Sequence, residues 1–126
     1  MQNVNPYNKM LEDAVMTASK EELTLMLYEG GIKFLNQALL AMEKKDVEKA
    51  HNLIVRAEDI VREFQITLDR KYDIALELDT LYNYMHRRLV EGNMRKDPEV
   101  IKEVLGMFRE FRDTWKEAMK LARVSG

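Results

Sequence analysis

The sequence predicts an all-α protein, an antiparallel four-helix bundle with a short extra helix at its amino terminus. Three observations favour this class. The 126 residues include only five glycines and two prolines, too few turn residues for an all-β chain. No segment alternates apolar and polar residues with the period of two that marks a strand. Four long stretches of about 18 to 26 residues instead repeat apolar residues at helical spacing, and short links join them, as in antiparallel bundles.

The first predicted helix is short and begins at the amino terminus. Asn5 is a good N-cap, and Pro6 suits the first helical position, so we expect a helix that continues to about Met16. The segment 1–18 is then expected to pack on the bundle. The chain length suits one hydrophobic core, so residues 1–126 are expected to form a single helical-bundle domain.

The second and third helices have clear start signals. Ser19 followed three residues later by Glu22 is a capping box, which predicts a long helix from Ser19 to about Glu43. Asp46 is the N-cap expected for the next helix, which continues to about Leu68.

The fourth helix is predicted from about residue 74 to 91. Gly92-Asn93 follows it, and glycine and asparagine commonly end helices because they tolerate the left-handed conformation. Asp97-Pro98 then begins the last helix, which can continue to about Arg123. The expected core face of the fourth helix consists of Ile74, Leu78, Leu81, Met85 and Leu89. That of the last helix consists of Ile101, Val104, Leu105, Phe108, Phe111, Trp115, Ala118 and Ala122.

The second helix is apolar over an unusually wide arc. At about 100° per residue its apolar side chains fill about twice the arc that one core face needs. Gly31 falls within this arc, and Gly30 and Gly31 each cost the helix about 1 kcal/mol relative to alanine. Either the second helix is the most central one of its own bundle, or a helix of another molecule covers part of the arc. Under the second interpretation the candidate partner-binding residues are Leu25, Tyr28, Gly31, Ile32, Leu35 and Leu39.

The composition offers little for catalysis. The chain has no cysteine and two histidines, and its formal charge is -2, so we expect no catalytic residues, no cofactor and no attraction to nucleic acid. Glu48 and His51 have the Glu-x-x-His spacing of a di-iron helical bundle, but they supply only half of the ligand set that such a site requires. A metalloenzyme therefore stays an alternative, although no metal site is expected. Because no long uncharged apolar segment or leader is evident, we expect no membrane insertion and a soluble, cytoplasmic protein.

Three segments together resemble the flagellin export chaperone family FliS. They are TASKEELTLMLYEGGIKF at 17–34, LYNYMHRRL at 81–89 with Asn93 after it, and FRDTWKEA at 111–118. The resemblance covers nearly the whole chain, in order and with matching spacing. One departure is Lys20, where the family often has proline at the first helical position.

The resemblance implies a non-enzymatic chaperone that works in the cytoplasm. It implies binding of the disordered carboxy-terminal segment of flagellin, prevention of premature polymerisation, and delivery of flagellin to the flagellar type III export gate. It also implies that the amino-terminal segment lies over part of the client surface when flagellin is absent, which adds Tyr7, Met10 and Leu11 to the candidate partner-binding residues. A self-assembling structural bundle, with the wide arc closed by a second copy in a homodimer, stays open as an alternative.

Overall fold

The fold confirms the predicted helical bundle. The computed structural model describes Pro6, Lys9 and residues 19–125, and apart from Pro6 and Lys9 the first predicted helix lies outside these residues. Within them the chain forms four helices and no strand. The helices are α2 (Lys20–Glu43), α3 (Val47–Thr67), α4 (Ala75–Arg95) and α5 (Pro98–Ser125).

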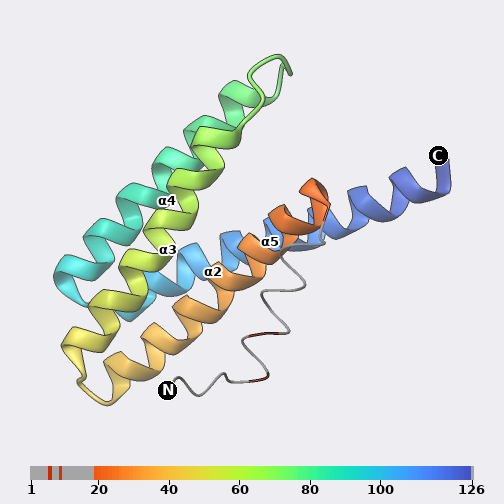
Figure 1. Ribbon diagram of the computed structural model, residues 1–126. Coiled ribbons are helices and arrows are strands. Elements are labelled where there is room, and N and C mark those ends of the chain that lie inside the picture. The colour runs from red at the N-terminus through yellow and green to blue at the C-terminus, as the bar shows by residue number, and fades with distance from the viewer. Residues whose placement is uncertain (1–5, 7–8, 10–18, 126) are drawn as a thin grey trace.

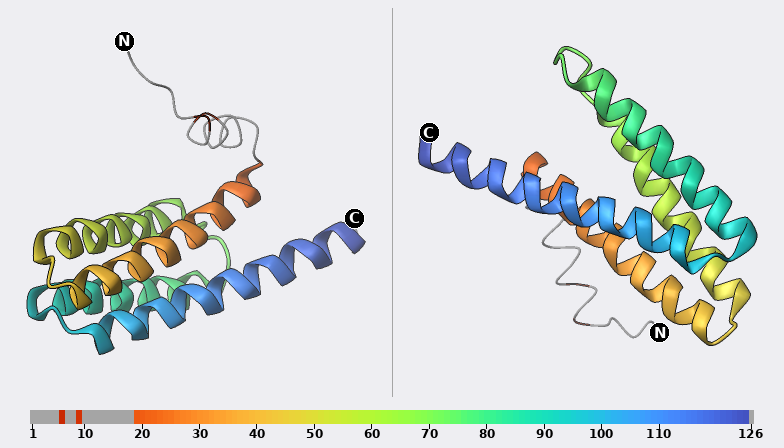
Figure 2. Two further views of the ribbon diagram at one scale, coloured as in Figure 1. Left: turned by 90° about the horizontal axis from the view of Figure 1, so that it is seen from below. Right: turned by 180° about the vertical axis from the view of Figure 1, so that it is seen from behind.

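The four helices are antiparallel to their neighbours and form a ring of contacts. Helix α2 packs on α3 and α5, and α4 packs on α3 and α5. The four helix axes do not stay close together along their full length. The hairpin of α3 and α4 diverges from α2 and α5 towards the α3–α4 connection (Figure 1). Two further views show the same divergence and show that α5 continues beyond the other helices (Figure 2). One end of the bundle is therefore open.

The predicted starts of α2 and α3 are confirmed by their capping bonds. The Ser19 hydroxyl accepts a hydrogen bond from the backbone amide of Glu22 at 3.2 Å. The Asp46 carboxylate accepts one from the amide of Lys49, also at 3.2 Å. Each bond satisfies an amide that has no partner inside its helix, which is why these side chains mark a helix start.

The predicted end of the fourth helix is wrong. Helix α4 continues through Gly92 and ends at Arg95, and the left-handed residue is Lys96, with φ of 51°. Gly92 serves packing instead, because a Cβ there would lie 2.9 Å from Cδ1 of Ile101 in α5. Asn93 is buried, and its amide nitrogen lies 2.9 Å from Nδ1 of His51. These tertiary contacts override the local tendency of Gly-Asn to end a helix.

The core lies between all four helices, but parts of the predicted core faces are exposed. The largest fully buried side chains are Phe108, Leu35, Ile54, Met85, Leu89, Ile101, Val61 and Val104. On α4 the prediction is wrong for Ile74 and Leu81, which are 55% and 41% exposed, whereas Tyr82 is buried. Ile74 precedes the helix, and Leu81 faces the open end of the bundle. On α5 it is wrong for Ala118 and Ala122, which are exposed because the helix has there passed its neighbours.

The two adjacent glycines of α2 have different surroundings. A Cβ on Gly31 would overlap with the ring of Phe108, whose Cδ1 would lie only 2.8 Å away. Phe108 belongs to α5 of the same chain, so the helix that comes close at Gly31 is part of this bundle. A Cβ on Gly30 would lie at an ordinary contact distance, 3.7 Å, from Cδ1 of Ile60.

Alanine at these two positions is therefore expected to change stability in opposite directions. Gly31→Ala should lower the free energy of unfolding by about 1–3 kcal/mol, because the fully buried Phe108 ring would have to shift to make room for the added methyl group. Gly30→Ala should raise it by up to about 1 kcal/mol, because alanine is the better helix former. Urea unfolding of both variants checks this, and equal effects would contradict the packing at Gly31.

Candidate partner-binding groove

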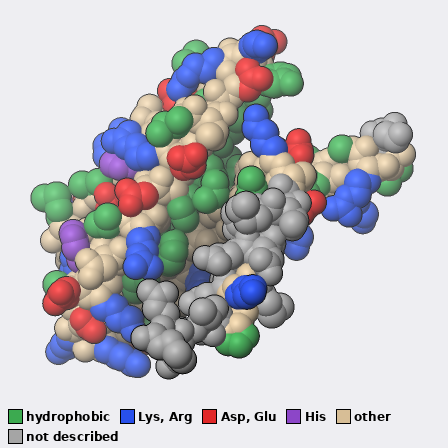
Figure 3. All heavy atoms as spheres, viewed as in Figure 1, with side chains coloured by type: hydrophobic (Ala, Val, Ile, Leu, Met, Phe, Trp, Pro, Cys, Tyr) green, Lys and Arg blue, Asp and Glu red, His purple; other side chains and the backbone are tan. Residues whose placement is uncertain are grey.

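The open end of the bundle forms a groove between the four helices. The groove has a volume of about 1410 Å³, and it is lined by residues of α2, α3, α4, α5 and the α3–α4 connection. The opening and the hydrophobic side chains on its walls are visible in Figure 3. Small-molecule sites usually enclose about 300–1,000 Å³, so the groove is larger and suits a polypeptide. Its main apolar lining residues are Leu27, Phe64, Leu78, Leu81, Phe111 and Trp115.

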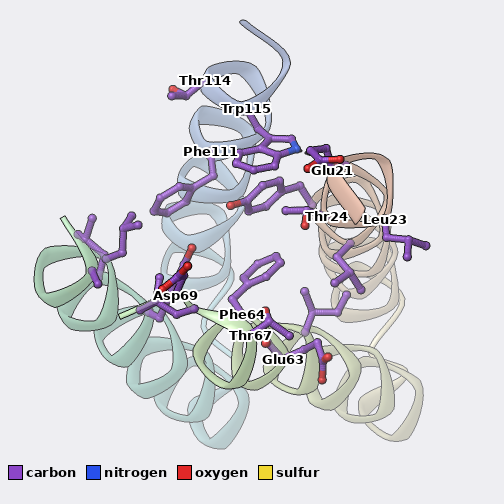
Figure 4. A pocket seen from close by; sticks show the side chains of 18 of the residues that line it. Glu21, Leu23, Thr24, Glu63, Phe64, Thr67, Asp69, Phe111, Thr114 and Trp115 are labelled. Atoms are coloured by element: carbon purple, nitrogen blue, oxygen red, sulfur yellow. Dashed lines mark hydrogen bonds between the residues drawn. The ribbon is translucent and has the colours of Figure 1, made fainter. Parts of the chain in front are cut away.

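Aromatic rings form one continuous cluster along the groove. Tyr28 of α2 is the centre of this cluster, with its ring centroid 4.6 Å from that of Phe64 and 5.9 Å from that of Phe111. The Tyr82 ring lies 5.4 Å from Phe64 and 5.7 Å from Phe111. In Figure 4 the side chains of Phe64, Phe111 and Trp115 point into the space between the helices. Tyr28, Phe64 and Tyr82 are buried, whereas Phe111 and Trp115 stay partly exposed. Partly exposed aromatic rings offer apolar area with few rotatable bonds, which favours binding.

Trp115 is held in place at the mouth of the groove. Its indole nitrogen donates a hydrogen bond to the backbone carbonyl of Glu21 in the first turn of α2, at 2.9 Å. Its ring packs edge-on against Tyr28, with the centroids 6.5 Å apart. Because one end of the side chain is bonded and the other stays partly exposed, Trp115 presents a fixed apolar surface to the groove.

Two tyrosine hydroxyls are part of the aromatic cluster. Burial raises the pKa of both Tyr28 and Tyr82 above the usual tyrosine value, and the nearby Tyr82 hydroxyl raises the pKa of Tyr28 further. Both groups therefore stay protonated and uncharged over the whole physiological pH range. The groove thus has polar hydroxyls in its aromatic cluster without a buried charge.

Of the six predicted partner-binding residues on α2, four are buried or packed against the core and do not line the groove. Gly31, Ile32 and Leu35 are buried, and Leu39 is partly buried against the core. Leu25 is partly buried as well. The three remaining candidates, Tyr7, Met10 and Leu11, lie outside the described residues.

Of the candidates from α2, only Tyr28 lines the groove. The structure brings Tyr28 together with Phe64, Phe111 and Trp115, which the sequence had not singled out as partner-binding. A contact between a partner and the other candidates stays a prediction.

The groove residues of α5 carried a detectable signal in the sequence. The apolar stripe of the last predicted helix continues to Ala122, further than a bundle with helices of equal length needs. Helix α5 has 28 residues, compared with 21 in α3 and in α4. An apolar stripe that outlasts its neighbours indicates either a partner or exposed surface, so Phe111 and Trp115 could have been chosen as binding residues.

The histidines and acidic residues do not form a metal cluster in the part of the chain that the structure describes. Nδ1 of His51, the histidine of the Glu48-x-x-His51 spacing, lies next to the Asn93 amide at 2.9 Å. Nε2 of His86 lies 4.0 Å from Glu58. Burial lowers the pKa of His86 and raises that of Glu58, so burial disfavours the charged form of both. None of the described helices combines the length and hydropathy that a membrane span requires.

Comparisons with known proteins point to one family. A family model described as "Flagellar protein FliS" matches residues 3–122. The chain is 39% identical over 119 residues to the flagellar secretion chaperone FliS of Bacillus subtilis. The aligned region covers 94% of this chain and 90% of that protein. It is 36% identical over 110 residues to FliS of Salmonella typhimurium, and the aligned region covers 85% of this chain and 82% of that protein. It is 33% identical over 112 residues to FliS of Escherichia coli, and the aligned region covers 86% of this chain and 82% of that protein.

Proposed function

Because the chain belongs to the FliS family of flagellar secretion chaperones, we propose that its groove binds the disordered carboxy-terminal segment of flagellin. The family confirms the expectation of a chaperone instead of an enzyme, and it implies a flagellar protein as the partner. In the proposed role the chaperone holds flagellin in the cytoplasm, prevents its premature polymerisation and delivers it to the type III export gate.

The observation that carries the proposal is the open aromatic groove. A segment that is disordered when free loses conformational entropy when it folds on a partner, so it needs a large apolar surface to compensate. The groove offers such a surface, because Leu81, Phe111 and Trp115 line it together with at least partly exposed side chains and each belongs to a helix of the bundle. An amphipathic helix laid into an apolar groove is a common binding mode for such segments.

Calorimetric titration of the full chain with a flagellin carboxy-terminal peptide tests this proposal. Burial of a large apolar area predicts binding with a strongly negative heat-capacity change, measured as the slope of the binding enthalpy against temperature. Absence of binding heat at every temperature would contradict the proposal. Measuring the molecular mass of the protein at several dilutions, with and without flagellin, distinguishes this proposal from self-assembly. A tight homodimer that flagellin does not change would favour the self-assembling bundle.

Two leucines provide a matched test of the groove. Leu81 of α4 lines the groove and is 41% exposed, whereas Leu40 of α2 lies outside it and is 56% exposed. Leu81→Asp should weaken binding of the flagellin peptide about tenfold, because it places a charge on the apolar contact surface. Leu40→Asp should change binding less than about twofold, as expected for a site outside the interface. Equal losses in the two titrations would show that the groove is not the binding surface.

The amino-terminal segment is proposed to cover part of the groove in the free protein. Tyr7, Met10 and Leu11 of segment 1–18 then occupy apolar surface that flagellin also uses. Removal of residues 1–18 is expected to leave the bundle folded by circular dichroism and to leave flagellin binding equal or tighter, because nothing has to be displaced. Weaker binding by the truncated chain would contradict this role.

A further inference from the structure

The walls of the groove are acidic. Five carboxylates line it, and the one basic side chain among its described lining residues is Lys20. Over the whole chain the corresponding numbers are 22 acidic and 20 basic residues. The five-to-one excess in the groove is therefore a local feature and not a consequence of the composition. We call these five residues the acidic rim: Glu21, Asp59, Glu63, Asp69 and Glu110.

The acidic rim surrounds the apolar part of the groove. Glu21 comes from α2, Asp69 from the α3–α4 connection and Glu110 from α5. Asp59 and Glu63 are four residues apart on α3, so they lie on the same side of that helix. Figure 4 shows Glu21, Glu63 and Asp69 on different sides of the space into which the aromatic side chains point. A helix lying in the groove would thus have carboxylates on more than one side.

The carboxylates of the acidic rim are available for a partner. All five residues are exposed, and none of them makes an ion pair within the described residues. Two arginines that are near them in sequence are paired elsewhere, Arg70 with Asp79 at 3.5 Å and Arg112 with Asp113 at 3.0 Å. Of the five, the Asp69 carboxylate accepts a hydrogen bond from the backbone amide of Lys71 at 3.0 Å. Opposite charges on a partner would therefore meet carboxylates that make no ion pair among the described residues.

We propose that the groove selects a helical segment whose apolar face is flanked by lysine or arginine and disfavours one flanked by aspartate or glutamate. This inference rests on the proposed function, since it describes the client segment of the same groove. The lining residues that stay at least partly exposed, among them Leu81, Phe111 and Trp115, supply most of the affinity through apolar burial. The acidic rim supplies specificity, because it penalises partners of like charge. It also raises the association rate, because complementary charge steers the encounter of the two molecules.

The test uses two synthetic helical peptides with the same apolar face, one flanked by lysines and the other by glutamates. Binding of each to the full chain is measured by calorimetry at low and at high salt. The lysine peptide should bind about tenfold more tightly at low salt, and the preference should shrink at high salt because exposed charges are screened. The flagellin carboxy-terminal peptide is titrated beside them.

A pair of matched variants assigns the preference to the acidic rim. Glu63→Gln with Asp69→Asn keeps the side-chain shapes and should reduce binding of the lysine peptide by about two- to fivefold per site. Glu43→Gln with Glu48→Gln removes the same charge from exposed residues at the other end of α2 and α3. This control should leave the preference unchanged, because its sites lie far from the groove.

The outcomes separate the charge preference from the proposed function. Equal affinity for the two synthetic peptides would overturn the charge preference even if flagellin binds. Binding of flagellin without binding of either synthetic peptide would also overturn it, because the groove would then not select by charge beside an apolar face. Preference for the lysine peptide without binding of flagellin would support the acidic rim and contradict the proposed client.

Discussion

Trp115→Ala is expected to weaken binding of the flagellin carboxy-terminal peptide by at least about 30-fold, since an aromatic hot-spot residue of an interface contributes about 2 kcal/mol or more. Trp115 lies at the mouth of the groove, fixed by its hydrogen bond to the Glu21 carbonyl and by its contact with Tyr28. Truncation removes the ring from the contact surface and leaves an unfilled space beside it. Titration calorimetry of the variant with the peptide measures the loss.

Two further variants control this prediction. Trp115→Phe keeps an aromatic ring but loses the hydrogen bond to Glu21, so it should recover a large part of the affinity. Val90→Ala shortens an exposed apolar side chain of α4 outside the groove and should have almost no effect. A Trp115→Ala protein that is folded by circular dichroism and binds with unchanged affinity would contradict the assignment of the groove.

Phe108→Ala is expected to lower the free energy of unfolding by about 3–5 kcal/mol, the usual cost of removing a buried phenylalanine. Phe108 is fully buried, lies against Gly31 of α2 and has its ring centroid 6.2 Å from that of Phe64 in α3. One side chain of α5 thus contacts two other helices. A domain of this size is stable by only about 5–15 kcal/mol, so urea should unfold the variant at a much lower concentration.

Phe111→Ala is the matched control for Phe108→Ala. It is the same substitution three residues further along α5, but Phe111 is partly exposed and lines the groove. Phe111→Ala should therefore lower the free energy of unfolding less than Phe108→Ala does. Relative to that loss of stability, it should weaken flagellin binding more than Phe108→Ala does. If both variants lost the same stability and the same affinity, the distinction between core and groove on α5 would be wrong.

The helix starts could be predicted because they depend on neighbouring residues alone. Ser19 and Asp46 accept hydrogen bonds from amides three residues ahead, and those positions are visible in the sequence. The end of α4 could not be read in this way. Gly92 lies against Ile101 and Asn93 beside His51, and these contacts join positions that are distant in the chain or on different helices.

The groove could be predicted only in part, because it depends on the angle between helices. The sequence indicates that α2 has apolar surface for more than one neighbour, and Gly31 indicates a close approach. It does not indicate that Phe108 of the same chain fills that place. Nor does it indicate that α3 and α4 diverge from α2 and α5, which exposes Leu81 and Trp115 to one shared space. Those angles follow from the packing of all four helices together.

The fluorescence of Trp115 during titration with a tryptophan-free flagellin peptide tests the central proposal most directly. The chain contains a single tryptophan, and it lines the groove, so every change in emission reports this site. If flagellin occupies the groove, the emission should shift to shorter wavelength and become protected from quenching by iodide, because the partly exposed indole is removed from water. Binding detected by calorimetry with no change in Trp115 emission or quenching would place flagellin elsewhere and contradict the proposal.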